Sequence, residues 1–136
     1  MTTEKLFAAC ECGAIQFSVW DDFDYVGFCH CKDCQRLSGS AFATFGGIKL
    51  KHLEVTKGDS NIQQYEKSPD SVYCFCKDCG CNLFSIKSES GLAHIRLGGL
   101  DKRPSKRPQL HIVVESKADW YEICDELPQF ERLPPG

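Results

Sequence analysis

The sequence contains no apolar run that approaches the ~20 residues a helix needs to span a membrane. It also has no excess of positive charge: the formal net charge is −3, and the basic residues form one loose cluster at 102–107. Nucleic-acid-binding faces carry a denser set of basic residues than this. The start of the chain lacks the charged segment and apolar run of a signal peptide. We therefore expect a soluble, cytoplasmic protein that binds neither membranes nor nucleic acids.

No long segment shows the 3.6-residue period of an amphipathic helix. Short alternating segments recur instead, separated by Gly, Pro, Asn, Asp and Ser. A chain of 136 residues has the usual length of one domain. The pattern predicts a single all-β domain over residues 1–136, mainly β with one or two short helical turns. Strands are expected at 15–20, 41–45, 48–55, 82–87, 92–97 and 111–115, a helix at 31–38, and a second turn near 117–121.

The segment 92–97 shows how such a strand would divide its side chains. Ala93, Ile95 and Leu97 alternate with His94 and Arg96. Successive side chains of a strand point to opposite faces of a sheet. We therefore expect the three apolar residues to face the core, and His94 and Arg96 to face elsewhere.

Cysteine is abundant, with ten residues among 136, and seven of them fall into three tight clusters. Without an export signal the thiols should stay reduced, which favours metal sites over disulfides. Cysteines one or two residues apart can present two sulfurs to one ion. The clusters are Cys10-Glu-Cys12, Cys29-His-Cys31-Lys-Asp-Cys34 and Cys76-Lys-Asp-Cys79.

The first and third clusters together supply the four ligands that a structural zinc site requires. We expect them to share one ion and to tie the start of the chain to its middle, so that metal binding contributes to folding stability. A purely local site within 74–81 is the alternative, but it would leave the first cluster without a role. The expected ligands are Cys10, Cys12, Cys76 and Cys79.

The middle cluster, Cys29, Cys31 and Cys34, supplies three sulfurs from six residues of chain. Three protein ligands and one open position are the pattern of a catalytic zinc. The alternative is a closed site, whose fourth ligand would be one of the three remaining cysteines. An all-thiolate site accepts iron as well as zinc. The remaining cysteines are Cys74, Cys81 and Cys124.

Basic side chains accompany the middle cluster. Lys32, Arg36 and His30 could offset the negative charge of the thiolates, and Arg36 is the candidate for binding the ligand. On an extended segment His30 would point away from the metal, so we expect it to pack or to hydrogen bond. His111 is likewise expected to have a structural role.

The motifs and their spacing resemble the glutathione-dependent formaldehyde-activating enzyme family, also called the centromere-protein-V-like family. The resemblance covers most of the chain, roughly residues 8–131. Cys81 and Cys74 depart from the usual family pattern. The matching stretches are CECG at 10–13, CHCKDCQRLSGSAF at 29–42, FCKDCGCNLF at 75–84, GLD at 99–101 and HIVVESKADW at 111–120.

The resemblance implies a β-tent fold of several coiled antiparallel sheets stapled by zinc. It implies two zinc ions per chain, a structural ion on the first and third clusters and a catalytic ion on the middle one, which makes Cys29, Cys31 and Cys34 the catalytic residues. The family's named activity is the synthesis of S-(hydroxymethyl)glutathione, a carbon–sulfur lyase reaction. The implied partner is a small thiol such as glutathione, with formaldehyde as co-substrate.

A non-catalytic zinc-binding module, which would bind a protein partner or buffer a thiol, is the alternative function. The sequence does not decide which aldehyde or thiol is natural. It also leaves the oligomeric state open, a homodimer included.

Overall fold

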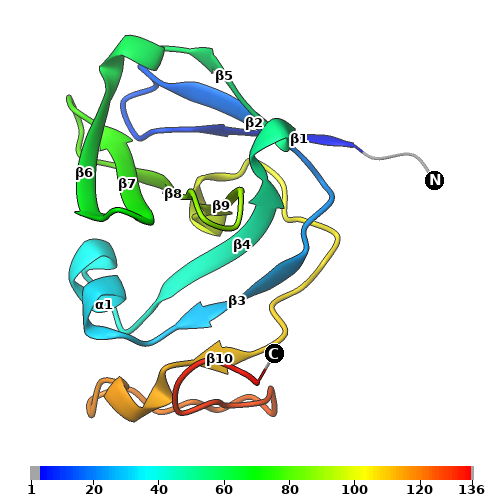
Figure 1. The fold of residues 1–136 in the computed structure, drawn as a ribbon, viewed down its shortest axis with the longest axis vertical. Coiled ribbons are helices and arrows are strands. Elements are labelled where there is room, and N and C mark those ends of the chain that lie inside the picture. The colour runs from blue at the N-terminus through cyan, green and yellow to red at the C-terminus, as the bar shows by residue number, and fades with distance from the viewer. Residues whose placement is uncertain (1–3, 136) are drawn as a thin grey trace.

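The computed structural model describes residues 4–135, and these residues form ten strands, one α-helix and four short 3-10 helices (Figure 1). The helix α1 spans Lys32–Ser38. The 3-10 helices span Leu50–His52, Asp59–Asn61, Leu97–Gly99 and Val114–Ser116. The strands are β1 (Lys5–Ala9), β2 (Gln16–Trp20), β3 (Tyr25–Cys29), β4 (Ala43–Lys49), β5 (Leu53–Lys57), β6 (Ile62–Ser68), β7 (Ser71–Cys76), β8 (Asn82–Lys87), β9 (Leu92–Ile95) and β10 (His111–Ile112).

The strands form two sheets. A three-stranded sheet has the order β1-β2-β5, and a seven-stranded sheet has the order β10-β3-β4-β9-β8-β7-β6. Neighbours pair antiparallel, except that the short β10 runs parallel to β3. In Figure 1 the small sheet lies at the top, and the chain after β10 folds back beneath β3. The predicted fold class, mainly β with several antiparallel sheets and a short helix, is confirmed.

The hydrophobic core lies where the small sheet covers one face of the large one. Phe17 of β2 and Phe84 of β8 join the two sheets in an edge-to-face contact, with ring centroids 5.2 Å apart. Ala93 and Ile95 are fully buried in this core, as the alternation in 92–97 predicts. The strand alternation therefore assigns one face of the large sheet to the core and leaves the other face free for polar residues.

Four of the predicted strand boundaries are wrong. The strand expected at 41–45 begins at Ala43 and continues without a break to Lys49. The strand expected at 48–55 is interrupted by Leu50–His52, because the chain leaves the large sheet after β4 and must turn before β5 joins the small one. The strand expected at 92–97 ends at Ile95, and Leu97 starts a 3-10 helix. The strand expected at 111–115 is only two residues long, because Val113 adopts a left-handed conformation with φ 56°.

Other predictions agree with the structure. Strand β8 has the bounds expected from the sequence, and α1 ends before Gly39, whose φ of 62° gives the left-handed cap that the helix needs. A turn closes at the expected place, where the Tyr121 N–H donates to the Ala118 carbonyl. Strands β1, β3, β6 and β7 were not predicted individually. In residues 4–135 no helix has the length and apolar character to cross a membrane.

Gly58, which lies between β5 and β6, packs closely against the backbone just before β2. Gly58 has φ +78°, and a Cβ atom added to it would lie 2.0 Å from the Ala14 carbonyl oxygen. Its carbonyl accepts a hydrogen bond from the Asn61 N–H, which orders the following 3-10 turn. Only glycine fits both the backbone conformation and this close approach.

We expect Gly58→Ala to lower the free energy of unfolding by about 2–4 kcal/mol, because it adds a steric clash to the cost of a positive φ. Gly91→Ala is the matched control, since Gly91 has φ +70° but no atom within 4 Å of the added Cβ, and it should cost only about 1 kcal/mol. Urea denaturation of both variants measures the difference. Equal losses in the two variants would contradict this account of Gly58.

Candidate metal centres and the cleft beside them

The structure brings four sulfur atoms together where β1 and β7 end. The Sγ atoms of Cys10, Cys12, Cys76 and Cys79 all lie within 4.8 Å of one another. Two of the separations, Cys10 to Cys12 and Cys12 to Cys76, are 3.7 Å. A regular tetrahedron with metal–sulfur bonds of about 2.3 Å has edges of about 3.8 Å, so the sulfur positions fit a four-coordinate zinc.

Hydrogen-bond donors point at this four-sulfur group. The Ile15 N–H donates to Cys10 Sγ at 3.3 Å, and Asn61 Nδ2 donates to Cys76 Sγ at 3.3 Å. The backbone N–H of Cys79 lowers the pKa of Cys76, because it stabilises the thiolate form. Donors of this kind orient metal-bound thiolates and disperse their charge.

The second group, Cys29, Cys31 and Cys34, is built where β3 passes into α1. Cys29 ends the strand, Cys31 caps the helix and Cys34 lies in its first turn, with the Cys34 N–H donating to Cys31 Sγ at 3.3 Å. The three sulfurs lie within 4.8 Å of one another. The local strand-to-helix turn is therefore enough to assemble this three-sulfur group.

The three thiols lie so close together that each changes the pKa of the others. Hydrogen bonds from Cys29 and then Cys34 lower the pKa of Cys31 to about 2, whereas the Cys31 sulfur raises the pKa of Cys29 to about 11. The pKa of Cys34 is also raised, by Cys29 and then Cys31. A second thiolate beside the first is unfavourable, and a divalent cation lets all three ionise together. The donor set thus fits a thiophilic metal ion.

The three cysteines outside both groups lie away from the three-sulfur group. Cys74 is buried in the hydrophobic core, and Cys124 is exposed in the C-terminal segment. Cys81 is partly buried, packs against the core and bonds the backbone carbonyl of Asn82. Within residues 4–135, no fourth cysteine, histidine or carboxylate belongs to the three-sulfur group. Neither a closed second site nor a local site within 74–81 matches this arrangement.

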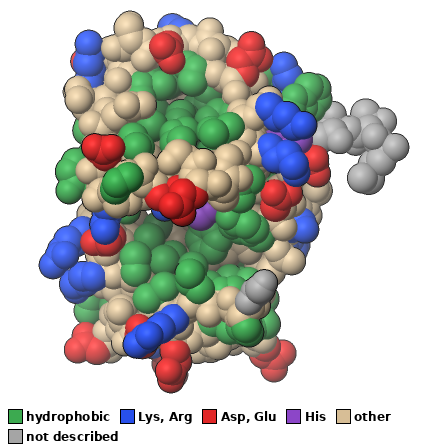
Figure 2. Space-filling model, viewed as in Figure 1, with side chains coloured by type: hydrophobic (Ala, Val, Ile, Leu, Met, Phe, Trp, Pro, Cys, Tyr) green, Lys and Arg blue, Asp and Glu red, His purple; other side chains and the backbone are tan. Residues whose placement is uncertain are grey.

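The three-sulfur group opens onto a cleft of about 520 Å³ on the polar face of the large sheet. Figure 2 shows this side of the molecule hollowed, with apolar side chains around the hollow. Strand register explains the lining: Tyr73 of β7 pairs with Ser85 of β8, and Ser85 pairs with His94 of β9, so their side chains share one face. The sheet therefore places polar groups from β7, β8 and β9 opposite the cysteines of β3 and α1.

Three basic residues line this cleft: Lys67, which forms a salt bridge with Asp33, and the two residues Lys87 and Arg96. Lys87 Nζ donates to the Ser71 hydroxyl at 2.7 Å. Arg96 Nη2 donates to Ser85 Oγ at 2.9 Å and Nη1 to the Thr44 carbonyl at 3.4 Å, while its Nε is buried without a hydrogen-bond partner in the described structure. Neither Lys87 nor Arg96 forms a salt bridge within residues 4–135.

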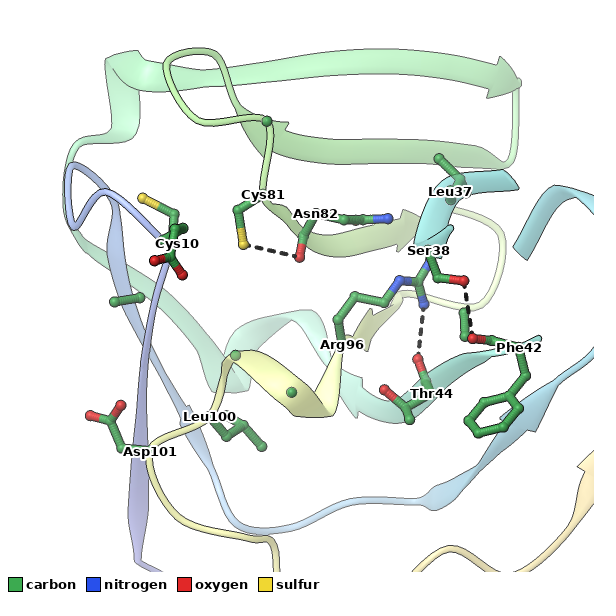
Figure 3. Close-up of a pocket in the computed structure, with 16 residues that line it drawn as sticks. Cys10, Leu37, Ser38, Phe42, Thr44, Cys81, Asn82, Arg96, Leu100 and Asp101 are labelled. Atoms are coloured by element: carbon green, nitrogen blue, oxygen red, sulfur yellow. Dashed lines mark hydrogen bonds between the residues drawn. The ribbon is translucent and has the colours of Figure 1, made fainter. Parts of the chain in front are cut away.

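Arg96 also lines a second pocket, of about 700 Å³, which borders the four-sulfur group (Figure 3). In that view its side chain extends from the ribbon towards the Thr44 carbonyl, with Asn82 above it and Ser38 beyond. The Oδ1 atom of Asn82 is buried and, like Arg96 Nε, has no partner in the described structure. Arg96 therefore lies between the two metal-binding regions.

A tyrosine and a histidine form a hydrogen-bonded pair in the cleft, with the Tyr25 hydroxyl 2.7 Å from His94 Nε2. Burial, and then the positive charges of Lys87 and Arg96, lower the pKa of His94 to about 4. Burial, and then the charge of Asp24, raise the pKa of Tyr25. Both groups are therefore uncharged at neutral pH and form a neutral hydrogen bond.

The other histidine pair lies behind the three-sulfur group. His30 is fully buried, and its Nε2 lies 2.8 Å from Nδ1 of His111, whose Nε2 lies 3.0 Å from a carboxylate oxygen of Asp125. His30 is not part of the three-sulfur group. These hydrogen bonds agree with the packing role expected of both histidines.

Arg36 and Lys32 are exposed on α1, and neither lines the cleft. Arg36 lies beside a separate depression with Tyr65 and Phe75, so its role in ligand binding remains a prediction. The residues that sequence reasoning missed are Lys87 and Tyr25. The alternation in 92–97 predicted that His94 and Arg96 face away from the core. The local sequence did not show which side chains they would contact.

We expect the four-sulfur group to bind zinc and to stabilise the fold, because it joins segments far apart in the chain. Cys76→Ser should lose about one metal ion per chain and lower the free energy of unfolding by about 3 kcal/mol or more. Elemental analysis and thermal denaturation measure both quantities. Cys124→Ser, which changes an exposed cysteine outside both groups, should match the wild type. Unchanged metal content in Cys76→Ser would contradict the assignment.

Three comparisons with known proteins concern the family and the fold. The family model described as glutathione-dependent formaldehyde-activating enzyme matches residues 5–116. A Halomonas elongata protein named "Putative glutathione-dependent formaldehyde-activating enzyme" is 25% identical over 126 residues, 87% of this chain and 80% of that protein. A crystal structure of a Rhodobacter sphaeroides protein has a TM-score of 0.59 at 21% identity, covers 70% of this chain and 87% of its own, and supports the fold alone.

The match to the family model extends over most of the chain, from β1 to the 3-10 turn that follows β10. It includes both sulfur groups and the strands that line the cleft. The resemblance inferred from the cysteine motifs is thereby confirmed. The chain belongs to the glutathione-dependent formaldehyde-activating enzyme family.

Proposed function

We propose that this protein is a zinc-dependent carbon–sulfur lyase that joins glutathione to formaldehyde to give S-(hydroxymethyl)glutathione, and catalyses the reverse reaction. The observation that carries the proposal is the three-sulfur group, which within residues 4–135 has no fourth cysteine and has a cleft beside it. A site with an open position is typical of a catalytic zinc. Membership of the family supports glutathione and formaldehyde as the substrates.

Cys29, Cys31 and Cys34 would hold the catalytic ion, and the four-sulfur group would hold a structural one. Zinc bound by three thiolates supplies a position at which a substrate thiol loses its proton at neutral pH. The walls of the cleft position that thiol and limit the access of water.

In the forward reaction the thiolate sulfur of glutathione attacks the carbonyl carbon of formaldehyde and forms a carbon–sulfur bond. The electron pair of the carbonyl moves to oxygen, which must then take up a proton. The Tyr25 hydroxyl is suited to donate it, because Tyr25 is protonated at neutral pH and the neutral His94 ring lies 2.7 Å away. The proton released by the glutathione thiol replaces the proton that Tyr25 donated, so the reaction as a whole neither gains nor loses a proton.

We expect Cys34→Ser to lose the second zinc ion together with glutathione binding, while Cys81→Ser retains both. Elemental analysis gives the metal content, and titration calorimetry gives the thiol affinity. Exchange NMR then measures how far each protein accelerates hydroxymethyl transfer above the spontaneous rate. Two tightly held ions without thiol binding in the wild type would favour a non-catalytic zinc module instead.

Tyr25→Phe should lower the turnover number about 10- to 100-fold, because the oxygen then lacks a positioned proton donor. The affinity for glutathione should stay close to that of the wild type, since the phenyl ring is retained. Thr56→Ala, which changes an exposed hydroxyl outside the cleft, is the control. A turnover number unaffected by Tyr25→Phe would remove Tyr25 from the mechanism.

A further inference from the structure

We propose that Lys87 and Arg96 form a carboxylate-binding subsite, so that the cleft selects thiols that carry negative charge. The proposal rests on the proposed function, because it assigns the part of the cleft that would bind the substrate away from its sulfur. It names a class of substrate, an anionic thiol such as an acidic peptide with a cysteine, and two residues that recognise it.

Both cations come from adjacent segments of one sheet and face the cysteines across the cleft. Lys87 ends β8, and Arg96 directly follows β9, its pairing partner. Both line the same cleft as Cys29, Cys31 and Cys34. A cleft of about 520 Å³ is within the size range of small-molecule sites. A bound thiol whose sulfur lies at the cysteines would therefore extend across the cleft towards the two cations.

Neither cation forms a salt bridge with a carboxylate in residues 4–135. Two acidic residues line the cleft: Asp33 forms a salt bridge with Lys67 at 2.8 Å, and Asp70, which accepts a hydrogen bond from the Glu89 N–H at 2.6 Å, acts on Lys87 only through its charge. Buried charges are normally paired. Burial, and then the charge of Arg96, lower the pKa of Lys87, and an anionic ligand would relieve the repulsion between the two cations.

Both cations also have N–H groups that are free to donate to a bound carboxylate. A guanidinium group has five N–H donors. Arg96 uses one to Ser85 and one to the Thr44 carbonyl, and its Nε is buried, so one N–H on each of Nη1 and Nη2 is left for a ligand. The two existing bonds hold the guanidinium in place. The ammonium of Lys87 has three donors, of which Ser71 accepts one. A carboxylate has the lone pairs to accept from both groups.

The two cations could have a second role, which is to offset the thiolates. Both lie within electrostatic reach of Cys29 and Cys34. If charge offset were their only role, replacing them would weaken every thiol equally, because all thiols present the same thiolate. If they bind a carboxylate, replacement weakens only thiols that carry one. Ligands with and without carboxylates therefore separate the two roles.

The test uses zinc-loaded protein and two pairs of ligands, glutathione with its diethyl ester and S-methylglutathione with its diethyl ester. In the wild type the acid of each pair should bind about 10- to 100-fold more tightly than its ester, as expected for hydrogen bonds to charged groups. Arg96→Gln and Lys87→Met should each reduce this ratio about tenfold, and Arg96→Lys should retain part of it. Titration calorimetry measures all the affinities.

Two controls accompany these measurements. Lys102→Met removes the same charge from an exposed loop and should leave the ratio unchanged, which excludes an effect of net charge. Zinc content and melting temperature are measured for every variant, because a purely structural role would change them without changing the ratio. S-methylglutathione has no free thiol, so its ratio in the wild type tests the subsite even if a variant fails to fold.

Equal affinities for acid and ester in the wild type would overturn the subsite while leaving the proposed function intact. An unchanged ratio in folded, zinc-loaded Arg96→Gln and Lys87→Met would overturn the assignment to these residues. If zinc-loaded wild type binds neither glutathione nor its ester, the proposed function itself fails. The two failures are therefore distinguishable.

Discussion

The two-residue alternation of the seven-stranded sheet is the constraint on which the rest of the structure depends. On one face Phe84, Ala93 and Ile95 pack beneath the small sheet and form the core. On the other face the intervening residues, Ser85, Lys87 and His94, line a cleft. A shift of register by one residue would exchange the two faces, so the burial of the core also holds the polar groups in place.

The sulfur groups have different relations to this sheet. The four-sulfur group joins the end of β1 to the end of β7, so it links the small sheet to the large one and depends on long-range contacts. The three-sulfur group comes from one continuous strand-to-helix turn and lies at the mouth of the cleft. The proposed structural and catalytic roles thus fall on separate groups, and Arg96 lines pockets beside both.

Much of the candidate site could be predicted from the sequence, because Cys-x-Cys and Cys-x-x-Cys spacing is a local property of the chain. Local patterns also predicted α1, with Cys31 at its start and Gly39 after its end, and the bounds of β8. The predictions failed where the chain changes sheets, as at Leu50–His52, and where Val113 takes a left-handed conformation. Contacts distant in sequence determine both positions, so no local pattern could show them.

The sequence by itself determined the family, the cysteines that form the two sulfur groups and which residues of 92–97 face away from the core. Only the tertiary structure decided what those residues meet. The strand order β3-β4-β9-β8 brings His94 beside Tyr25 and places Lys87 and Arg96 across the cleft from the three-sulfur group. The physical reason is that a strand's own alternation sets the face on which a side chain lies, whereas its neighbours across that face depend on how distant strands pair.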